Sequence, residues 1–225
     1  MKTIPIIYED NHLLVVNKPP NILTQGDRTG DIDMLTLLKQ DLKKRYDKPG
    51  NVYLGLIHRL DRPVGGVMVF AKTSKAASRL SDQIRRNVFQ KTYMAVIHGN
   101  PLKKRGRLTH YLVKDKRTNI VSTVRKSTEK AKKAILEYEL MESAQDFSLV
   151  KINLHTGRPH QIRVQFSTIG HPLYGDQKYG RNKKGRQIAL VSEQISFEHP
   201  TLKEEMSFSS NIKKHKPWDK FHTLF

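Results

Sequence analysis

The middle of the chain, from about Arg107 to Met141, alternates short β-rich runs with lysine-rich links. The runs read LTHYLV, NIVSTV and AILEYEL. This alternation favours antiparallel hairpins over strand–helix–strand crossovers. The predicted fold class is therefore α+β, with a central mixed, mostly antiparallel β-sheet flanked by helices and loops, and not a doubly wound α/β fold.

Three helices are predicted outside this region. Residues 33–45 carry an apolar stripe with acidic residues at its start, and an apolar residue recurs every three or four positions over 74–88, with Ser74 as N-cap. Pro159 fits the first position of a helix over HQIRVQFSTIG, which Gly170 ends.

Short apolar runs bounded by turn residues predict the strands. They are Leu13–Val16, Val52–Leu60, Val67–Ala71, Thr92–His98 and Val150–Leu154. No repeat and no long low-complexity linker interrupts them, so residues 1–225 are predicted to form one continuous catalytic-sized domain.

The charge is strongly unbalanced. Lys and Arg number 41 against 21 Asp and Glu, a formal net charge of +20. Such an excess favours a polyanionic partner, and nucleic acid fits better than a membrane surface, since no segment shows a clear basic amphipathic helix. RNKKGR (Arg181–Arg186) and KKHK (Lys213–Lys216) are cationic clusters in predicted loops, where solubilising charge and phosphate contact stay equally open.

The chain has no cysteine, which excludes disulfides, thiolate nucleophiles and cysteine zinc sites. A reducing cytoplasm is the simplest setting. Neither a signal peptide nor a membrane-spanning run is found in the sequence.

One acid stands among cations in LIHRLDRPVGG. Asp61 lies between Arg59 and Arg62, with His58 close by, where an apolar run breaks into a Pro/Gly turn. The two arginines favour the ionised carboxylate, which suits a nucleophile or base better than a proton donor. From these residues alone, a plain ion pair at a strand end is the more common outcome.

A second stretch, LHTGRPHQIR, concentrates hydrogen-bond donors. Arg158, His160, Gln161 and Arg163 lie on a turn and the first turn of the predicted helix, where anions are favoured. His160 and Arg163 are three residues apart and share a helix face. A capped surface helix would have the same pattern.

The sequence gives little support for a metal site or a nucleotide-binding site. Histidines 155, 160 and 171 have no acidic partner at a familiar ligand spacing, and the chain has no P-loop, dinucleotide fingerprint or nucleophile elbow. We therefore expect side-chain chemistry with no metal and no cofactor.

Taken in order, the motifs resemble a known family. HRLDRPVGG, then KTYMAVIHG, then TGRPHQIRVQFSTIGHPLYGDQKYG, with the opening YEDNHLLVVNKPP and the ending ISFEHPTLKEEMSF, are similar to RluA-type RNA pseudouridine synthases over nearly the whole chain. The resemblance implies the pseudouridine synthase catalytic fold. It also implies a cofactor-free isomerase that breaks the bond between ribose and N1 of a uridine, rotates the uracil and rejoins it through C5.

The resemblance also implies roles for residues. Asp61 matches the essential aspartate that acts at C1′ of the sugar, and Arg59 the arginine that enters the RNA as the base flips out. Tyr93 matches the tyrosine against the uracil, which also takes part in proton transfer at the sugar, Arg163 the arginine that pairs with the catalytic carboxylate, and Leu190 an apolar residue bordering the pocket. The predicted catalytic residues are thus Asp61, Tyr93 and Arg163. The residues predicted to contact RNA are Arg59, Arg62, His58, Arg158, His160, Gln161 and Leu190.

Two segments depart from the pattern. Relatives often have Thr-Ser-Gly where this chain has Val64, Gly65 and Gly66, and Leu-His-Ala where it has Leu190, Val191 and Ser192. Neither removes a catalytic group, so the choice of RNA target is what they affect. Because the motif YEDNHLL begins at Tyr8, we expect no separate N-terminal RNA-binding domain.

The leading hypothesis is an RNA pseudouridine synthase, acting as a cytoplasmic monomer with no membrane and no obligate protein partner. Large-subunit ribosomal RNA ranks ahead of transfer RNA as its target. The alternatives are a non-catalytic RNA-binding protein, for instance in ribosome assembly, and an N-glycosidase that releases uracil. A pure binder has no need for Asp61, Tyr93 and Arg163 together.

Overall fold

The computed structural model describes residues 4–180 and 187–224 and divides them between two compact units. The first unit comprises Met1–Gln90 and Ser192–Asn211, and the second comprises Lys91–Val191 and Ile212–Phe225. Each unit is therefore built from two separate stretches of chain. The α+β class is confirmed, and the RNKKGR cluster (Arg181–Arg186) lies outside the described residues.

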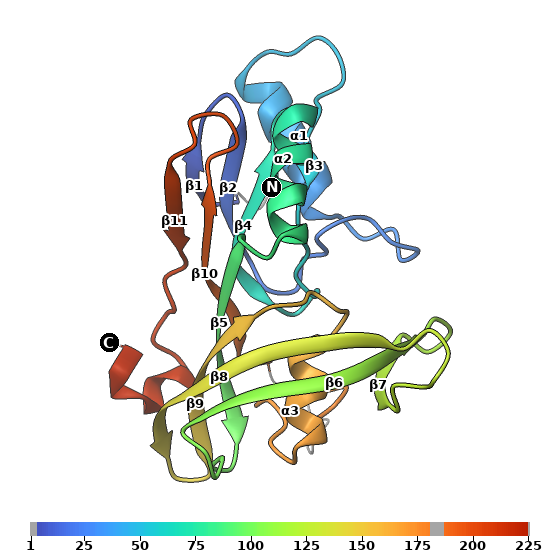
Figure 1. Cartoon of the computed structure of the whole chain (residues 1–225). Helices are drawn as coiled ribbons and strands as arrows, with labels where there is room; N and C mark the ends of the chain where they lie inside the picture. The colour runs from blue at the N-terminus through green and yellow to red at the C-terminus, as the bar shows by residue number, and fades with distance from the viewer. Residues whose placement is uncertain (1–3, 181–186, 225) are drawn as a thin grey trace. The chain divides into compact units, whose positions relative to one another are not determined.

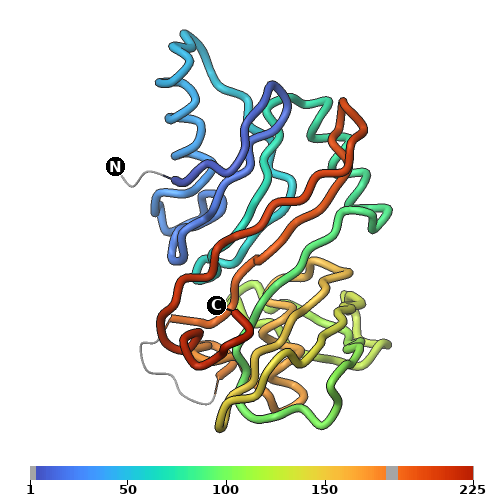
Figure 2. Tube along the Cα trace, turned by 90° about the vertical axis from the view of Figure 1, so that its left-hand side faces the viewer, coloured from blue at the N-terminus to red at the C-terminus, as the bar shows by residue number. Residues whose placement is uncertain are grey.

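The first unit is a sheet with two helices (Figures 1 and 2). Its strands follow the order β1-β2-β4-β10, with β11 on β10 and β3 on β4. The strands are β1 (Ile6–Glu9), β2 (Leu13–Lys18), β3 (Gly55–Leu56), β4 (Gly65–Ala71), β10 (Leu190–Glu198, in this unit from Ser192) and β11 (Glu205–Ser209). Every residue of β4 is buried, as expected for an interior strand with an uninterrupted apolar sequence.

Side-chain caps set the starts of both helices of the first unit. Asp33 caps α1 (Met34–Arg45), since its Oδ1 accepts a hydrogen bond from the Thr36 N–H at 3.1 Å. Thr73, and not the predicted Ser74, caps α2 (Ser74–Arg85). The predicted strand Val52–Leu60 is also wrong in extent, because only β3 is extended there and most of the stretch forms a loop.

The core of the first unit joins segments far apart in sequence. Leu13 of β2, Val67 of β4, Leu80 of α2 and Phe197 of β10 belong to one buried cluster. At roughly 1.5–3 kcal/mol for each large apolar side chain buried, these contacts supply much of the unit's stability.

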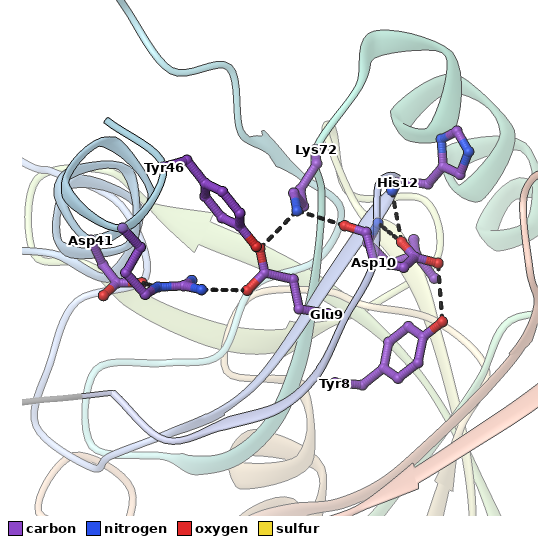
Figure 3. A network of polar contacts seen from close by, with 9 residues as sticks. Tyr8, Glu9, Asp10, His12, Asp41, Tyr46 and Lys72 are labelled. Atoms are coloured by element: carbon purple, nitrogen blue, oxygen red, sulfur yellow. Dashed lines mark hydrogen bonds and ion pairs between the residues drawn. The ribbon is translucent and has the colours of Figure 1, made fainter. Parts of the chain in front are cut away.

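A polar network fastens the β1–β2 hairpin to α1 and to the end of β4 (Figure 3). The Glu9 carboxylate pairs with Arg45 at 2.9 Å and with Lys72 at 2.7 Å, and it accepts a hydrogen bond from the Tyr46 hydroxyl at 3.0 Å. Burial acts to raise the pKa of Glu9, but the bonds from Lys72, Arg45 and Tyr46 hold the pKa below its ordinary value.

Asp10 fastens the same hairpin to the β10–β11 hairpin. Its carboxylate accepts the backbone N–H groups of His12 and Leu13 at 2.7 and 2.6 Å, and it bonds His199 Nε2 at 2.8 Å. The ring of His199 is fully buried, and its Nδ1 accepts the N–H of Leu202 at 2.8 Å. The imidazole is therefore neutral, with its proton on Nε2.

The second unit is a sheet of antiparallel strands with α3 (Gln161–Thr168) packed beside it (Figure 1). Its strands follow the order β5-β9-β8-β6-β7. They are β5 (Gln90–His98), β6 (Arg105–Asp115), β7 (Ile120–Val124), β8 (Lys132–Ala144) and β9 (Phe147–Leu154). Hairpins connect β6 to β7 and β8 to β9, which confirms the reading of the middle region.

Two buried clusters and two short 3₁₀ helices, η1 (Trp218–Lys220) and η2 (His222–Leu224), complete the second unit. Trp218 and Phe221, near the end of the chain, pack with Met94 and Val96 of β5. No helix in the described part of the chain is long and apolar enough to cross a membrane.

Candidate active site

Asp61 lies in the loop between β3 and β4 of the first unit. Its carbonyl accepts the Val64 N–H at 2.9 Å, which closes a turn over the intervening residues. Arg59 and Arg62 are exposed on this loop, whereas Asp61 itself is half-buried. The loop therefore presents one partly covered acid beside two cations that face solvent.

The main chain on both sides of Asp61 is held by the segment that follows β2. Thr24 Oγ1 donates to the Leu60 carbonyl at 2.8 Å and accepts the Leu60 N–H at 3.3 Å. The Asn21 N–H donates to the Arg62 carbonyl at 2.8 Å. These bonds fix the backbone immediately before and after the acid, so the main chain that carries it is in place before any substrate arrives.

Lys18, which the sequence does not single out, makes the largest contribution to this bracing. Its side chain is buried, with 1% of the residue exposed, and its Nζ donates to the carbonyls of Pro19, Arg62 and Val64 at 3.1, 3.1 and 2.7 Å. An ammonium group has three protons, and here each one has an acceptor. Lys18 is the last residue of β2, LLVVNK, and no local pattern in that strand marks it as a donor to a distant loop.

Burial lowers the pKa of Lys18 to about 7, and the negative charge of Asp61 opposes this shift. Lys18 is thus both a structural donor and a charge that interacts with the candidate catalytic carboxylate.

Arg62 departs from the prediction that both flanking arginines stabilise Asp61. Its guanidinium pairs with Asp31 at 2.6 Å, with about half of each side chain exposed. The positive charge of Arg62, which was predicted to stabilise Asp61, therefore pairs with Asp31. Arg62 as an RNA contact stays a prediction.

His58 contributes to the packing of the first unit. Its Nε2 accepts the Val69 N–H of β4 at 3.2 Å, and its ring lies 5.7 Å from that of Phe89. The acceptor role fixes the proton on Nδ1. Its predicted contact with RNA is untested.

The two segments that contain the departures from the family pattern approach each other in the first unit, at Gly66 and Ser192. Gly66 has φ +118°, and a Cβ at this position would overlap the backbone of Ser192. Ser192 is fully buried and donates through Oγ to the Val67 carbonyl at 3.0 Å. Gly66 is thus required by a close approach between β4 and β10.

Tyr93 lies on β5 of the second unit, opposite Ile152 of β9, with 5% of its surface exposed. Lys91 precedes it by two residues and so lies on the same face of the strand. Burial lowers the pKa of Lys91 as well. Leu190 is also buried, with 6% exposed.

Arg163 of α3 forms a buried two-pronged ion pair with Asp176. Arg163 Nε and Nη2 donate to the two carboxylate oxygens at 2.8 and 2.7 Å, and the side chains are 8% and 0% exposed. Burial acts to raise the pKa of Asp176, but the guanidinium and the N–H groups of Tyr179 and Lys178 hold the pKa below its ordinary value. The pairing of Arg163 with Asp61 stays a prediction.

Tyr179 connects this ion pair with its surroundings. The Arg163 guanidinium lies 5.2 Å from the centre of the Tyr179 ring, and the Tyr179 hydroxyl bonds His160 Nδ1 at 2.6 Å. Tyr179 therefore contacts both Arg163 of α3 and His160, which precedes the helix, so the predicted helix face shared by His160 and Arg163 is not formed. The same hydroxyl accepts the Val121 N–H of β7 at 2.9 Å, so strand β7 is fastened to the Arg163 centre. The sequence motif GDQKYG contained both Asp176 and Tyr179, but nothing in it assigned them.

The turn before α3 differs from its prediction. The helix begins at Gln161 and not at Pro159, because His160 has a left-handed conformation at φ +50°. Gly170, at φ +84°, follows the helix end as expected.

Two residues that were predicted to contact RNA, Gln161 and Arg158, form hydrogen bonds within the second unit. Gln161 is buried and binds Thr156 and Ile135 through its amide, at 2.7 and 3.0 Å. Arg158 Nε donates to the Lys133 carbonyl at 3.0 Å. These donors stabilise the turn, and their contact with RNA stays a prediction. Within residues 4–180 and 187–224, no group of three or more His, Asp or Glu side chains is placed to hold a metal ion.

Known proteins match this sequence over most of its length. Residues 12–168 match the family model described as RNA pseudouridylate synthase. An uncharacterized RNA pseudouridine synthase of Bacillus subtilis, YjbO, is 35% identical over 210 residues, which are 92% of this chain and 72% of that protein. The ribosomal large subunit pseudouridine synthase D of Zymomonas mobilis is 31% identical over 92% of this chain and 68% of its own.

Solved structures share the fold. Human RNA pseudouridylate synthase domain containing 4 matches 93% of this chain and 89% of its own, with a TM-score of 0.77 and 24% identity. Human RNA pseudouridylate synthase domain containing 1 matches 93% of this chain and 83% of its own, with a TM-score of 0.74 and 24% identity.

Proposed function

This chain belongs to the RluA-type RNA pseudouridine synthase family and is an isomerase that acts on RNA, and from this premise we propose that it modifies specific uridines of structured RNA, large-subunit ribosomal RNA first. The name of the Zymomonas mobilis relative, ribosomal large subunit pseudouridine synthase D, supports this target. Transfer RNA is the second candidate.

The proposed reaction breaks the bond between C1′ and N1, turns the uracil and joins C1′ to C5. N1 gains a proton and C5 loses one, so the composition of the RNA does not change. The leaving base makes C1′ electron-poor, and a fixed carboxylate at that carbon stabilises the developing charge. We assign this role to Asp61.

The observation that carries the proposal is the bracing of the Asp61 loop. A carboxylate that must meet one carbon of a flipped nucleotide has to be placed within a fraction of an ångström. Lys18 and Thr24 hold the main chain around Asp61 through four hydrogen bonds. A carboxylate that served only in a structural ion pair would not require its loop to be fixed so closely.

The other proposed roles follow the family motifs. A base stacked in RNA is out of reach, so it has to be flipped out at a cost of a few kcal/mol, which is lowest in loops and bulges. Arg59, exposed on the same loop, is suited to fill the gap left by the base. Tyr93 is proposed to lie against the uracil and to take part in proton transfer at the sugar, and Arg163 to orient the catalytic carboxylate.

The test is a direct measurement of isomerisation by Asp61→Asn. Purified protein is incubated with in vitro transcribed large-subunit ribosomal RNA, and pseudouridines are located by carbodiimide adducts and primer extension. We expect no modification by this variant and an RNA affinity within a small factor of wild type. Turnover by the variant would refute the assigned mechanism.

A matched control tests whether the loss of any other negative charge also abolishes RNA modification. Asp82→Asn removes an acid that pairs with Arg85 and Arg86 on the surface of α2, and it should modify RNA at the wild-type rate. Free uracil in the wild-type reaction would identify an N-glycosidase, and absence of any modified site on ribosomal and transfer RNA would favour the binding protein.

A further inference from the structure

Residues 114–133 carry an unusual density of positive charge. This segment, here called the basic arm, comprises the end of β6, the turn after it, β7, the following link and the first two residues of β8. Its eight Lys and Arg are Lys114, Lys116, Arg117, Arg125, Lys126, Lys130, Lys132 and Lys133, against the two acids Asp115 and Glu129.

Strand register gathers these cations at one end of the second unit. β7 and β8 pair with β6 on its opposite sides, and Tyr111 of β6 lies opposite both Val124 of β7 and Lys133 of β8. The link 125–131 therefore has to pass from one side of β6 to the other near Tyr111. Since β6 ends four residues further on, at Asp115, roughly 14 Å along the strand, both basic segments occupy the same end of the sheet (Figure 1).

The cations of the basic arm face solvent, and its acids have partners within the arm. All eight Lys and Arg are exposed. Asp115 accepts the Arg117 N–H at 2.8 Å and the Thr118 hydroxyl at 2.7 Å, and Glu129 pairs with Lys130 at 3.3 Å. Within the described part of the chain, none of the other seven cations has an ion pair within 4.0 Å, so their charge is directed outward.

The basic arm is held in place by the fold. Leu112, Val121 and Ala134 pack on Val164 of α3 in a buried cluster. The Lys178 ammonium donates to the Asn119 carbonyl at 2.8 Å, which secures the turn after β6. A charged surface that is already ordered loses little entropy when it binds.

We propose that the basic arm is a second RNA-binding surface, which contacts the phosphate backbone away from the flipped uridine. This inference rests on the proposed function for its ligand, an RNA. A membrane surface fits less well, because Ile120 is the one exposed large apolar side chain within residues 114–133. Phosphate contacts carry no base information, so the arm would add affinity and register and leave the choice of uridine to other contacts.

The test compares two variants with the same change in net charge. The arm variant replaces Lys116, Arg117, Arg125 and Lys126 with Gln. The control variant replaces Lys43, Lys44, Lys48 and Lys75 with Gln, four exposed lysines of the first unit. Affinity for a fluorescein-labelled RNA hairpin is measured by anisotropy at several NaCl concentrations, with two different loop sequences.

We expect the arm variant to bind both RNA hairpins about ten- to a hundredfold more weakly. The slope of log affinity against log NaCl concentration should become smaller in magnitude by about one for each lost phosphate contact. The control should change affinity by less than threefold. Equal losses in both variants would show a general charge effect and overturn the proposal. Unchanged RNA binding with lost binding to phosphatidylserine vesicles would assign the arm to a membrane instead.

Repeating the binding assay in the Asp61→Asn background distinguishes the two proposals. If the wild type modifies no RNA but the arm variant still loses affinity, the proposed reaction fails and the RNA-binding surface stands. If the wild type modifies RNA and the arm variant binds as well as the control, only the arm proposal fails.

Discussion

The two units hold their key acids in different ways. In the first unit, Lys18 and Thr24 bind the backbone on either side of Asp61. In the second unit, Arg163 donates directly to both carboxylate oxygens of Asp176. Backbone bracing positions the main chain that carries an acid, whereas a two-pronged ion pair holds the carboxylate itself. The two units thus show two different ways of placing an acidic residue.

Asp176→Ala should have the largest effect of these variants on the unfolding free energy. It leaves the Arg163 guanidinium in a buried site without this partner, and removal of one member of a buried pair costs about 3–5 kcal/mol of unfolding free energy. Urea denaturation followed by circular dichroism measures it. Glu137→Ala is the control, because its pair with Arg107 is exposed and should be worth about 0–1 kcal/mol. Similar costs for the two variants would contradict the structural role of Asp176.

Lys18→Met tests the bracing of the first unit. It removes three hydrogen bonds. The Arg62 carbonyl keeps its bond from the Asn21 N–H, whereas the buried carbonyl of Val64 is left unsatisfied at a cost of about 1–3 kcal/mol. At a pH near 6, unfolding free energy should therefore fall, and isomerisation should fall with it because Asp61 loses its fixed position.

The same variant has a signed pH dependence. The pKa of Lys18 is about 7 in the folded protein against 10.5 ordinarily, so between these values the unfolded chain binds the extra proton. Wild-type stability relative to Lys18→Met should rise from about pH 7 to about pH 10 and be flat below pH 7. Lys43→Met, at an exposed lysine, should show no such slope. A flat difference for Lys18→Met would exclude a lowered pKa.

Tyr179→Phe sharpens the comparison with a smaller effect. The ring under Arg163 is kept, but the hydroxyl bonds to the Val121 N–H and to His160 Nδ1 are lost, at a cost of about 1–2 kcal/mol. Tyr138→Phe is the control in the same unit, because its hydroxyl has no hydrogen bond among the described residues, and it should stay within about 0.5 kcal/mol. The two variants are compared by thermal denaturation, and an equal loss would remove Tyr179 from its connecting role.

Sequence patterns predicted the parts of the fold that local rules govern. The apolar stripe of residues 33–45 predicted α1, and the alternation of β-rich runs and links predicted the hairpins of the middle region. The start of α3 was missed because His160 adopts a left-handed conformation, which Gly and Asn adopt far more often than other residues. The extent of β3 was missed because hydrogen bonds to a distant segment, and not local propensity, shape the chain from Val52 to Leu60.

The candidate site was predicted only in part. Family motifs pointed to Asp61, Tyr93 and Arg163, but the residues that position them came from tertiary contacts. A lysine is rarely buried, so nothing local marked Lys18 as the donor to the Asp61 loop. Asp176 was equally hidden, since its partner lies thirteen residues away and a short-range charge pattern does not connect them.

The interleaving of the two units bears on how the protein is made. Each unit needs chain from both sides of residue 191, since Ser192–Asn211 completes the first and Ile212–Phe225 the second. During synthesis from the N-terminus, the segment that carries Asp61 leaves the ribosome long before β10 and β11, which pack against its sheet. Neither unit can therefore reach its final core until the segment that follows residue 191 emerges, so RNA modification should begin only after that segment is synthesised.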